Sequence, residues 1–294
     1  MTLPHALRLF IIIALSQSAL AHQDSLQSKE TKKNEWSEIK TPIIGQAQAI
    51  GSYANGCQVG AVFMPEEGEG YVSIRRWRNR FYTQPVTLDL TRYIGQAVSA
   101  HGERILVGDS SQAIGGTMPY GHSSHQNGLD VDFWFYTQKT PSALPDPNLQ
   151  PPTMVNFKAG IMQSALWKPS YRDALYAAAT YPETTRVFVN PVIKQHLCRT
   201  ETDKSWLYKI RPWSGHDSHF HVRLECPFDS PLCERQEPVP LNDGCDADLD
   251  KWVLEQTEAV NNPKPAKKPN TPKKPKPKPE ACMILLQQAQ HHHG

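Results

Sequence analysis

Six cysteines constrain this chain more than any other feature of its sequence. None belongs to a Cys-x-x-Cys pair, so a zinc site built from sulfur ligands is not expected. An even number of cysteines in an exported chain instead predicts disulfides, and three bridges among six cysteines allow 15 connectivities. The cysteines lie at positions 57, 198, 226, 233, 245 and 282.

The N-terminus predicts export. A weakly basic start with His5 and Arg8 precedes an apolar run over residues 9–15, and Ala19-Leu20-Ala21 then offers a small-x-small cleavage site. We therefore expect residues 1–21 to be a secretory signal peptide. The apolar run is too short to span a bilayer, and no later stretch approaches the ~20 apolar residues that a membrane helix needs.

The cysteine positions indicate one local bridge directly and the other two less directly. Cys226 and Cys233 flank two prolines in a short loop and form the most local pair. Cys282 follows a lysine- and proline-rich tract, so a bridge from it would tether the far end of the chain to the body. The pairing that we favour is Cys57–Cys282, Cys198–Cys245 and Cys226–Cys233.

The formal net charge of +2 over 294 residues hides two parts of opposite charge. The tract over 261–280 holds seven lysines, seven prolines and one acid, and the rest of the chain is mildly acidic. Such a tract cannot pack a core and is expected to populate extended polyproline II. We favour a solvated spacer over attraction to an anionic polymer or membrane surface. It lacks interleaved aromatic residues, so nucleic acid is not an expected partner.

Apolar periodicity and turn residues divide the chain into parts. We expect a polar, mobile segment over 22–40, one globular domain over 41–260, the linker over 261–280, and a tail over 281–294 tethered by Cys282. Short strands and turns are expected over 42–72, and helices over 88–98, 170–180 (with Ser170 as N-cap) and 191–198. Further strands are expected over 104–109, 130–136, 185–190 and 219–225. Helices and strands mix without a regular βαβ alternation, which favours an α+β fold.

Five of the twelve histidines fall in two short stretches. The first, over 121–132, reads GHSSHQNGLDVD, and the second, over 215–221, reads GHDSHFH. Imidazole and carboxylate groups are the usual ligands of a catalytic Zn²⁺. Gly128 lets the chain turn, so that His125 on the loop can face Asp132 on the following strand. The first stretch therefore predicts part of a metal site.

The second stretch predicts two histidines on one face of a strand. Strand periodicity places His219, His221 and Arg223 on one side, and the apolar residues between them toward the core. A lone histidine is more often structural than a ligand, but five beside two aspartates favour a site. For Asp130 we favour a hydrogen-bonding role beside the ligands over a ligand role. The sequence contains no H-E-x-x-H, G-x-S-x-G, P-loop or dinucleotide-binding motif.

These residues carry a resemblance to a known group of enzymes. H-x6-D followed by H-x-H, here His125 to Asp132 and His219-x-His221, is the signature of the LAS zinc metallopeptidases, which the sequence resembles. Longer strings resemble more narrowly the penicillin-insensitive murein endopeptidase family, from about Pro42 to Trp252. They read AIGSYANGCQVGA, GHSSHQNGLDVD, TRVFVNPVIKQ and KIRPWSGHDSHFHVRLECP. The resemblance implies a central antiparallel sheet with flanking helices and loops, stabilised by disulfides. The lysine–proline tract is not part of the core family pattern.

The resemblance also implies roles for the site residues. His125, Asp132 and His221 would bind Zn²⁺, and His219 would be the catalytic histidine. His122 and His216 would line the same cleft and act as proton carriers, and His122 could also be an alternate metal ligand. The alternative is that each only hydrogen-bonds a carboxylate. The surplus of histidines leaves open whether one ion or two are bound.

The implied activity is hydrolysis of the D-alanyl–meso-diaminopimelyl crosslinks of peptidoglycan in the periplasm. No acyl-enzyme serine would be used. The alternatives are a D,D-carboxypeptidase or amidase acting on the same wall material, and a non-catalytic wall-binding module with the same fold. Partners among other envelope proteins are not predicted by the sequence.

Overall fold

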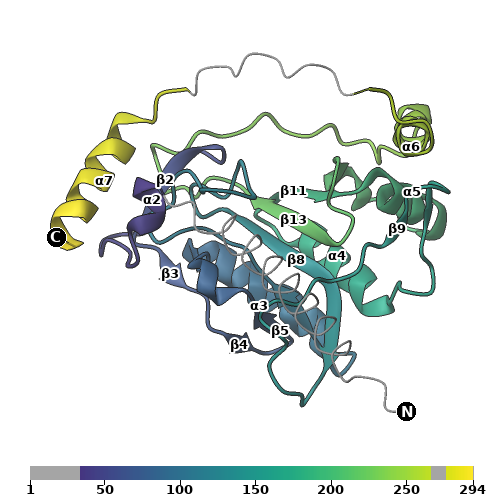
Figure 1. The fold of residues 1–294 in the computed structure, drawn as a ribbon, viewed down its shortest axis with the longest axis horizontal. Helices are drawn as coiled ribbons and strands as arrows, with labels where there is room; N and C mark the ends of the chain where they lie inside the picture. The colour runs from purple at the N-terminus through teal and green to yellow at the C-terminus, as the bar shows by residue number, and fades with distance from the viewer. Residues whose placement is uncertain (1–33, 266–275, 294) are drawn as a thin grey trace, which may run out of the picture.

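A seven-stranded sheet forms the centre of the molecule (Figure 1). The computed structural model describes residues 34–265 and 276–293. The strand order of the sheet is β12-β11-β13-β8-β7-β5-β4. Its strands are β4 (Glu67–Gly68), β5 (Tyr71–Ser73), β7 (Glu103–Val107), β8 (Asp130–Lys139), β11 (Thr184–Val189), β12 (Ile210–Pro212) and β13 (His219–Leu224). Small two-stranded sheets pair β1 (Gln48–Ser52) with β2 (Asn55–Val59), β3 (Val62–Phe63) with β6 (Tyr82–Thr83), and β9 (Val155–Asn156) with β10 (Ile161–Met162).

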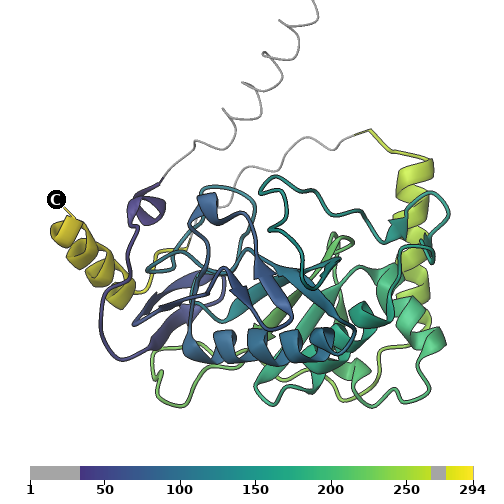
Figure 2. The same cartoon turned by 90° about the horizontal axis from the view of Figure 1, so that it is seen from below.

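Helices flank the central sheet, as the α+β prediction requires. They are α2 (Glu35–Glu38), α3 (Pro85–Ser99), α4 (Pro169–Thr180), α5 (Pro191–Thr200), α6 (Ala247–Asn261) and α7 (Glu280–His293), with 3₁₀ turns η2 (Arg76–Arg78) and η3 (Leu207–Lys209). The predicted helices and strands of the globular domain are confirmed to within a few residues. Helices α6 and α7, which the sequence pattern did not predict, lie at opposite ends of the molecule (Figures 1 and 2). In the described part of the chain no helix has the length and apolar content needed to cross a membrane.

The expectation of a purely antiparallel sheet is wrong, because the sheet is mixed. Strands β5 and β7 pair in parallel, as do β11 and β12, while the other neighbours in the sheet are antiparallel. Parallel neighbours need a crossover connection. Helix α3 lies between β5 and β7 in the chain, and α5 lies between β11 and β12. Two isolated crossovers do not produce a regular βαβ pattern, so the sequence did not reveal them.

The prediction that Ser170 caps helix α4 is also wrong. Lys168 is the N-cap, and Pro169 occupies the first helical position, where its missing N–H breaks no helical hydrogen bond. The Ser170 hydroxyl instead donates to Glu103 Oε2 at 2.6 Å. This hydrogen bond joins the start of α4 to the start of β7.

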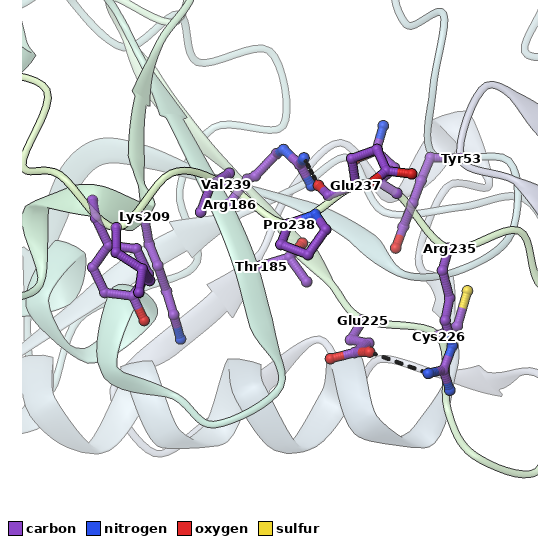
Figure 3. A pocket seen from close by; sticks show the side chains of 13 residues that line it. Tyr53, Thr185, Arg186, Lys209, Glu225, Cys226, Arg235, Glu237, Pro238 and Val239 are labelled. Carbon is purple, nitrogen blue, oxygen red and sulfur yellow. Dashed lines mark hydrogen bonds and ion pairs between the residues drawn. The ribbon is translucent and has the colours of Figure 1, made fainter.

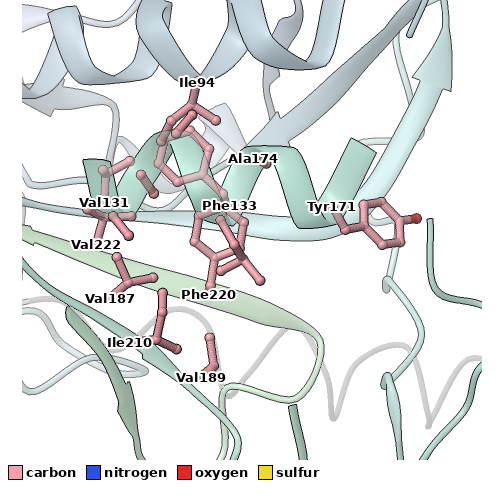
Figure 4. Close-up of a cluster of buried hydrophobic side chains, with 14 of the residues drawn as sticks. Ile94, Val131, Phe133, Tyr171, Ala174, Val187, Val189, Ile210, Phe220 and Val222 are labelled. Atoms are coloured by element: carbon pink, nitrogen blue, oxygen red, sulfur yellow. The ribbon is translucent and has the colours of Figure 1, made fainter. Parts of the chain in front are cut away.

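The main core lies on one face of the central sheet. Val131 and Phe133 of β8, with Phe220 and Val222 of β13, are fully buried on this face. Figure 4 shows them beside Ile94 of α3 and side chains of α4. Successive side chains of a strand point to opposite faces. The residues between these apolar side chains must therefore lie on the other face, which is where the histidines and aspartates of the two motifs are found.

A second, smaller core joins the two ends of the described chain. Helix α7 buries Cys282, Leu285, Leu286 and Ala289, whose i, i+3, i+4, i+7 spacing places them on one face. They pack in one cluster with Trp36 of α2, and Figure 1 shows α7 close to α2 and β2. The C-terminal helix is thus held by its own apolar face as well as by a disulfide.

Residues 34–40 correct the expectation of a mobile segment over 22–40. Asn34 caps α2, accepting a hydrogen bond from the Ser37 backbone, and the Trp36 side chain is only 3% exposed. Residues 22–33 lie outside the described residues. The predicted signal peptide also lies there, as does the middle of the lysine–proline tract over 266–275.

The three favoured disulfides are confirmed. The bridges are Cys57–Cys282, Cys198–Cys245 and Cys226–Cys233. The first one joins residues 225 positions apart and fixes the start of α7 to β2. Next to it, the Asn55 side-chain amide donates to the Pro277 carbonyl at 2.9 Å. The end of the linker is therefore held along β2.

We predict that removing the Cys57–Cys282 bridge costs more stability than removing the local one. The chain-entropy model gives about 5 kcal/mol for a loop of this length and about 2.5 kcal/mol for the short Cys226–Cys233 loop. The measurement is denaturant unfolding of Cys57→Ser/Cys282→Ser against Cys226→Ser/Cys233→Ser. Limited proteolysis should also release α7 from the first variant alone. Equal losses of stability in the two variants would contradict the prediction.

Candidate metal centre

The site begins with the register between β8 and β13. His221 lies directly opposite Asp132 in this antiparallel pair, and Arg223 lies opposite Asp130. All four side chains are on the face of the sheet opposite the main core, where alternation along each strand places them. The predicted grouping of His219, His221 and Arg223 on one face is therefore confirmed.

The loop before β8 brings in His125. Its backbone has φ = 64°, in the left-handed region that is uncommon for residues other than glycine. The His125 backbone N–H donates to Asp130 Oδ2 at 3.0 Å, which holds the loop in this conformation. Gly128 supplies the expected turn with φ = 80°. As a result His125 Nε2 lies 3.4 Å from Asp132 Oδ1, as the motif spacing predicted.

Four imidazole rings surround the Asp132 carboxylate. His125 Nε2 and His221 Nδ1 both approach Oδ1, at 3.4 Å and 3.2 Å. His122 Nδ1 and His219 Nε2 approach Oδ2, at 3.6 Å and 3.8 Å. The structure thus brings together, around one carboxylate, four of the five histidines that the sequence singled out.

Asp132 differs from two neighbouring buried carboxylates in having no arginine partner in the described part of the chain. Asp109 is paired with Arg80 at 2.9 Å and Arg78 at 3.4 Å, and Asp130 is paired with Arg223 at 2.8 Å. Among the described residues the ion-pair partners of Asp132 are all histidines, and its side chain is 1% exposed. A buried carboxylate needs compensating positive charge. Here that charge must come from protonated imidazoles or from a bound cation.

The pKa values follow from these partners. Burial disfavours the ionised forms of Asp109 and Asp130, but their partners outweigh this effect and hold both pKa values below the usual range. The partners of Asp109 are His122, Arg80 and Arg78. Those of Asp130 are Arg223 and His221. Burial lowers the pKa of His125. For His221 burial acts in the same direction, but Asp130 and Asp132 outweigh it and raise its pKa to about 9.

The donor set fits a divalent metal ion. His125 Nε2 and Asp132 Oδ1 are buried without a hydrogen-bond partner in the described structure, and a cation would satisfy both. Two ligands of one tetrahedral ion with bonds of about 2.0–2.1 Å lie about 3.3 Å apart. The His125–Asp132 and His221–Asp132 separations match this value. His221 Nε2 also lies 3.1 Å from Asp130 Oδ1, close enough for a carboxylate to orient a metal-binding imidazole, although the two atoms do not form a well-aligned hydrogen bond.

His122 provides an alternative third donor. His122, His125 and Asp132 each offer a ligand atom, and these atoms lie within 4.8 Å of one another. However, His122 Nε2 is hydrogen-bonded to Asp109 Oδ2 at 3.1 Å, and its Nδ1 approaches the other oxygen of Asp132. His221 does not belong to this cluster of three donors, but its Nδ1 approaches the same oxygen of Asp132 as His125 Nε2 does.

The last of the predicted histidines, His216, lines an open cleft of about 400 Å³ beside this centre. His122, His216 and His221 are on its walls, with Phe188 and Trp213. The ring centroids of His216 and His219 lie 5.0 Å apart. Burial lowers the pKa of His216 to about 4, and its backbone has φ = 52°. All five predicted histidines therefore belong to one centre and its cleft.

Two residues of the site, Asp109 and Trp134, were not singled out in the sequence. Asp109 was expected only as the end of a strand, yet it holds His122. Trp134 of β8 lies opposite His219, with ring centroids 5.0 Å apart, and its indole N–H donates to the Gly108 carbonyl at 2.5 Å. Strand alternation from Asp130 and Asp132 would have placed Trp134 on the site face. No local pattern marks Asp109, because its partners come from distant segments.

We predict that Asp130→Ala destabilises the fold by about 3–5 kcal/mol, because it leaves the buried Arg223 guanidinium unpaired. Adding Arg223→Met should recover part of this loss. The measurement is denaturant unfolding, with Asp173→Ala as the control. Asp173 pairs with His101 and Arg172 at the surface, so its removal should cost within about 0.5 kcal/mol. The expectation is wrong if Asp130→Ala is as stable as the control.

Comparison with known proteins places these residues in a family. A family model described as penicillin-insensitive murein endopeptidase matches residues 49–287. A relative of that name from Haemophilus influenzae is 41% identical over 258 residues, which cover 86% of this chain and 88% of the relative. Relatives of the same name from Klebsiella pneumoniae (strain 342) and Escherichia coli O157:H7 (strain EC4115 / EHEC) are 39% and 40% identical, covering 85% of this chain and 90% of each relative. This chain belongs to the penicillin-insensitive murein endopeptidase family.

Proposed function

We propose that this protein is a zinc-dependent murein DD-endopeptidase that hydrolyses D-alanyl–meso-diaminopimelyl crosslinks in peptidoglycan. Its family and the names of its relatives support murein endopeptidase activity. The main observation in favour of a bound metal ion is the environment of Asp132. This buried carboxylate has only imidazoles as ion-pair partners among the described residues. Two histidines and a carboxylate are a donor set that suits Zn²⁺.

His125, Asp132 and His221 would hold the ion, with Asp130 orienting His221 and His122 as a further donor. Zn²⁺ in such a site polarises a peptide carbonyl and acidifies a water molecule. His219 would move the proton or stabilise the developing oxyanion. Its ring is fixed against Trp134, and its Nε2 points to the same carboxylate as the ligands. His122 would be kept in place by Asp109, and His216 would line the substrate side of the cleft as a second proton carrier.

Three disulfides and a wall substrate support a location outside the cytoplasm. We propose the periplasm, reached through a signal peptide over residues 1–21. The globular domain over 41–260 would be the catalytic unit, followed by the linker over 261–280 and the tethered tail over 281–294. The tail's helix and disulfide belong to the same folded body.

We predict that chelation abolishes activity on purified sacculi. Prolonged treatment with phenanthroline or EDTA should remove the ion that Asp132 needs, and Zn²⁺ should restore activity together with one equivalent of bound metal. The products should be monomeric muropeptides derived from crosslinked dimers. Release of terminal D-alanine alone would indicate a carboxypeptidase, and release of intact stems an amidase. Full activity after complete metal removal would overturn the zinc proposal.

A second prediction separates the roles of the histidines. His219→Ala should lower kcat by about 100-fold or more while metal content is unchanged, since positioned proton-transfer groups contribute about 10²–10⁴-fold. His125→Ala should lose both metal and activity. His101→Ala is the matched control, because His101 is a partly exposed histidine paired with Asp173, outside the cleft. Unchanged turnover in His219→Ala would remove that histidine from the mechanism and favour a non-catalytic module.

A further inference from the structure

The cleft beside the metal centre adjoins a second cavity. The cleft of about 400 Å³ and a neighbouring cavity of about 200 Å³ share two lining residues, Arg186 and Gln236. Figure 3 shows this second cavity, with Arg186 and Glu237 on one side and the Glu225–Arg235 pair on the other. Arg186 therefore lies at the boundary between the histidine-lined cleft and the space next to it.

Strand register explains why Arg186 reaches the cleft. In β11, Val187 and Val189 point into the main core, so Arg186 and Phe188 point to the site face. Phe188 pairs with His221 of β13, and Arg186 pairs with Arg223. Two residues along a strand correspond to about 7 Å. The backbone of Arg186 is thus about 7 Å along β11 from Phe188, the residue that pairs with the proposed metal ligand His221.

The guanidinium of Arg186 is the cation of the cleft that has no carboxylate partner in the described structure. Its Nη2 donates to the Glu237 carbonyl at 2.5 Å, and it forms no ion pair among the described residues. The other arginine of the cleft, Arg223, is paired with Asp130. A guanidinium has five N–H donors and remains charged in proteins. Arg186 consequently retains donors and a full positive charge for a ligand.

An apolar surface lies next to this cation. The Trp213 side chain is 56% exposed, and its ring centroid is 5.7 Å from that of Phe188. Phe188 in turn contacts His221 at 5.3 Å between centroids. Both aromatic side chains line the cleft together with Arg186. The cleft therefore offers a positive charge and an aromatic wall within reach of the proposed metal ion.

We propose that Arg186 binds the free carboxylate of the meso-diaminopimelyl residue whose amino group forms the scissile bond, with the methylene chain of that residue against Phe188 and Trp213. Arg186 is then a specificity-determining residue. The proposal rests on the proposed endopeptidase function. The substrate matches this surface, because the diaminopimelyl residue carries a carboxylate next to the bond that is cut and an aliphatic chain beyond it. Paired N–H donors of a guanidinium suit a carboxylate.

The test removes the charge from the substrate and from the protein in turn. Crosslinked muropeptide dimers are compared with the same dimers amidated at the diaminopimelyl carboxylates. For the wild-type protein, amidation should lower kcat/KM by about 10- to 100-fold, the range for a charge-assisted hydrogen-bond pair. Arg186→Gln should show a similar loss on the free dimers and little further loss on the amidated ones. Arg186→Lys should keep part of the discrimination.

Arg235→Gln is the matched control. Arg235 lines the neighbouring cavity but not the cleft, and it is paired with the exposed Glu225. This variant should discriminate between the two dimers as the wild type does. Arg186 also anchors the Glu237 loop, so thermal melts establish that each variant is folded. If Arg186→Gln does not fold, the two dimers are compared on the wild-type protein and on Arg186→Lys, which keeps the charge but changes the paired N–H geometry.

Equilibrium binding of both dimers to the metal-free protein separates this inference from the proposed function. If the wild type cuts neither dimer, the endopeptidase proposal is wrong. The carboxylate site is still supported in that case if the wild type binds the free dimer more tightly and Arg186→Gln abolishes this preference. If the wild type cuts both dimers equally and binds them equally, the inference about Arg186 is overturned while the endopeptidase function stands. The inference is also overturned if Arg186→Gln discriminates between the dimers as strongly as the wild type.

Discussion

The pairing of β8 with β13 is the constraint on which the site depends. One register places His221 opposite Asp132 and Arg223 opposite Asp130, and the same register places Phe133 opposite Phe220 in the core. A shift by one residue would exchange the two faces of a strand. The apolar side chains that stabilise the fold therefore also determine which polar side chains meet on the other face. Stability and chemistry are set by one alignment of two strands.

Three buried carboxylates around this pairing have different partners. Asp130 and Asp109 are each compensated by arginine, and both hold a histidine of the site. Asp132, at the centre, is surrounded by imidazoles alone among the described residues. Arginine is permanently charged and cannot bind a metal, whereas imidazole can lose its proton and become a ligand. The distribution of arginine thus separates the carboxylates that support the site from the one suited to bind a cation.

The sequence predicted the parts of the fold that depend on local pattern. Alternation over 219–225 and helical spacing over 88–98 gave the correct elements, and the cysteine positions led to the correct disulfides. The mixed sheet was not predicted, since strand direction is decided by tertiary pairing. Helix α7 was missed although the spacing of Cys282, Leu285, Leu286 and Ala289 carried the signal. Asp109 could not be found from sequence, because its relation to His122 and Arg80 exists only in the folded chain.

The C-terminal segment has a consequence for the order in which the molecule is completed. The Lys278 ammonium contacts the side-chain oxygen of Gln126, the residue next to His125, across 152 positions of the chain. The Cys57–Cys282 bridge anchors the chain shortly after Lys278. The loop that carries His125 is therefore synthesised well before Lys278, the residue that contacts it. A chain that stopped before Lys278 would contain every proposed metal ligand and still lack this contact to the metal-site loop.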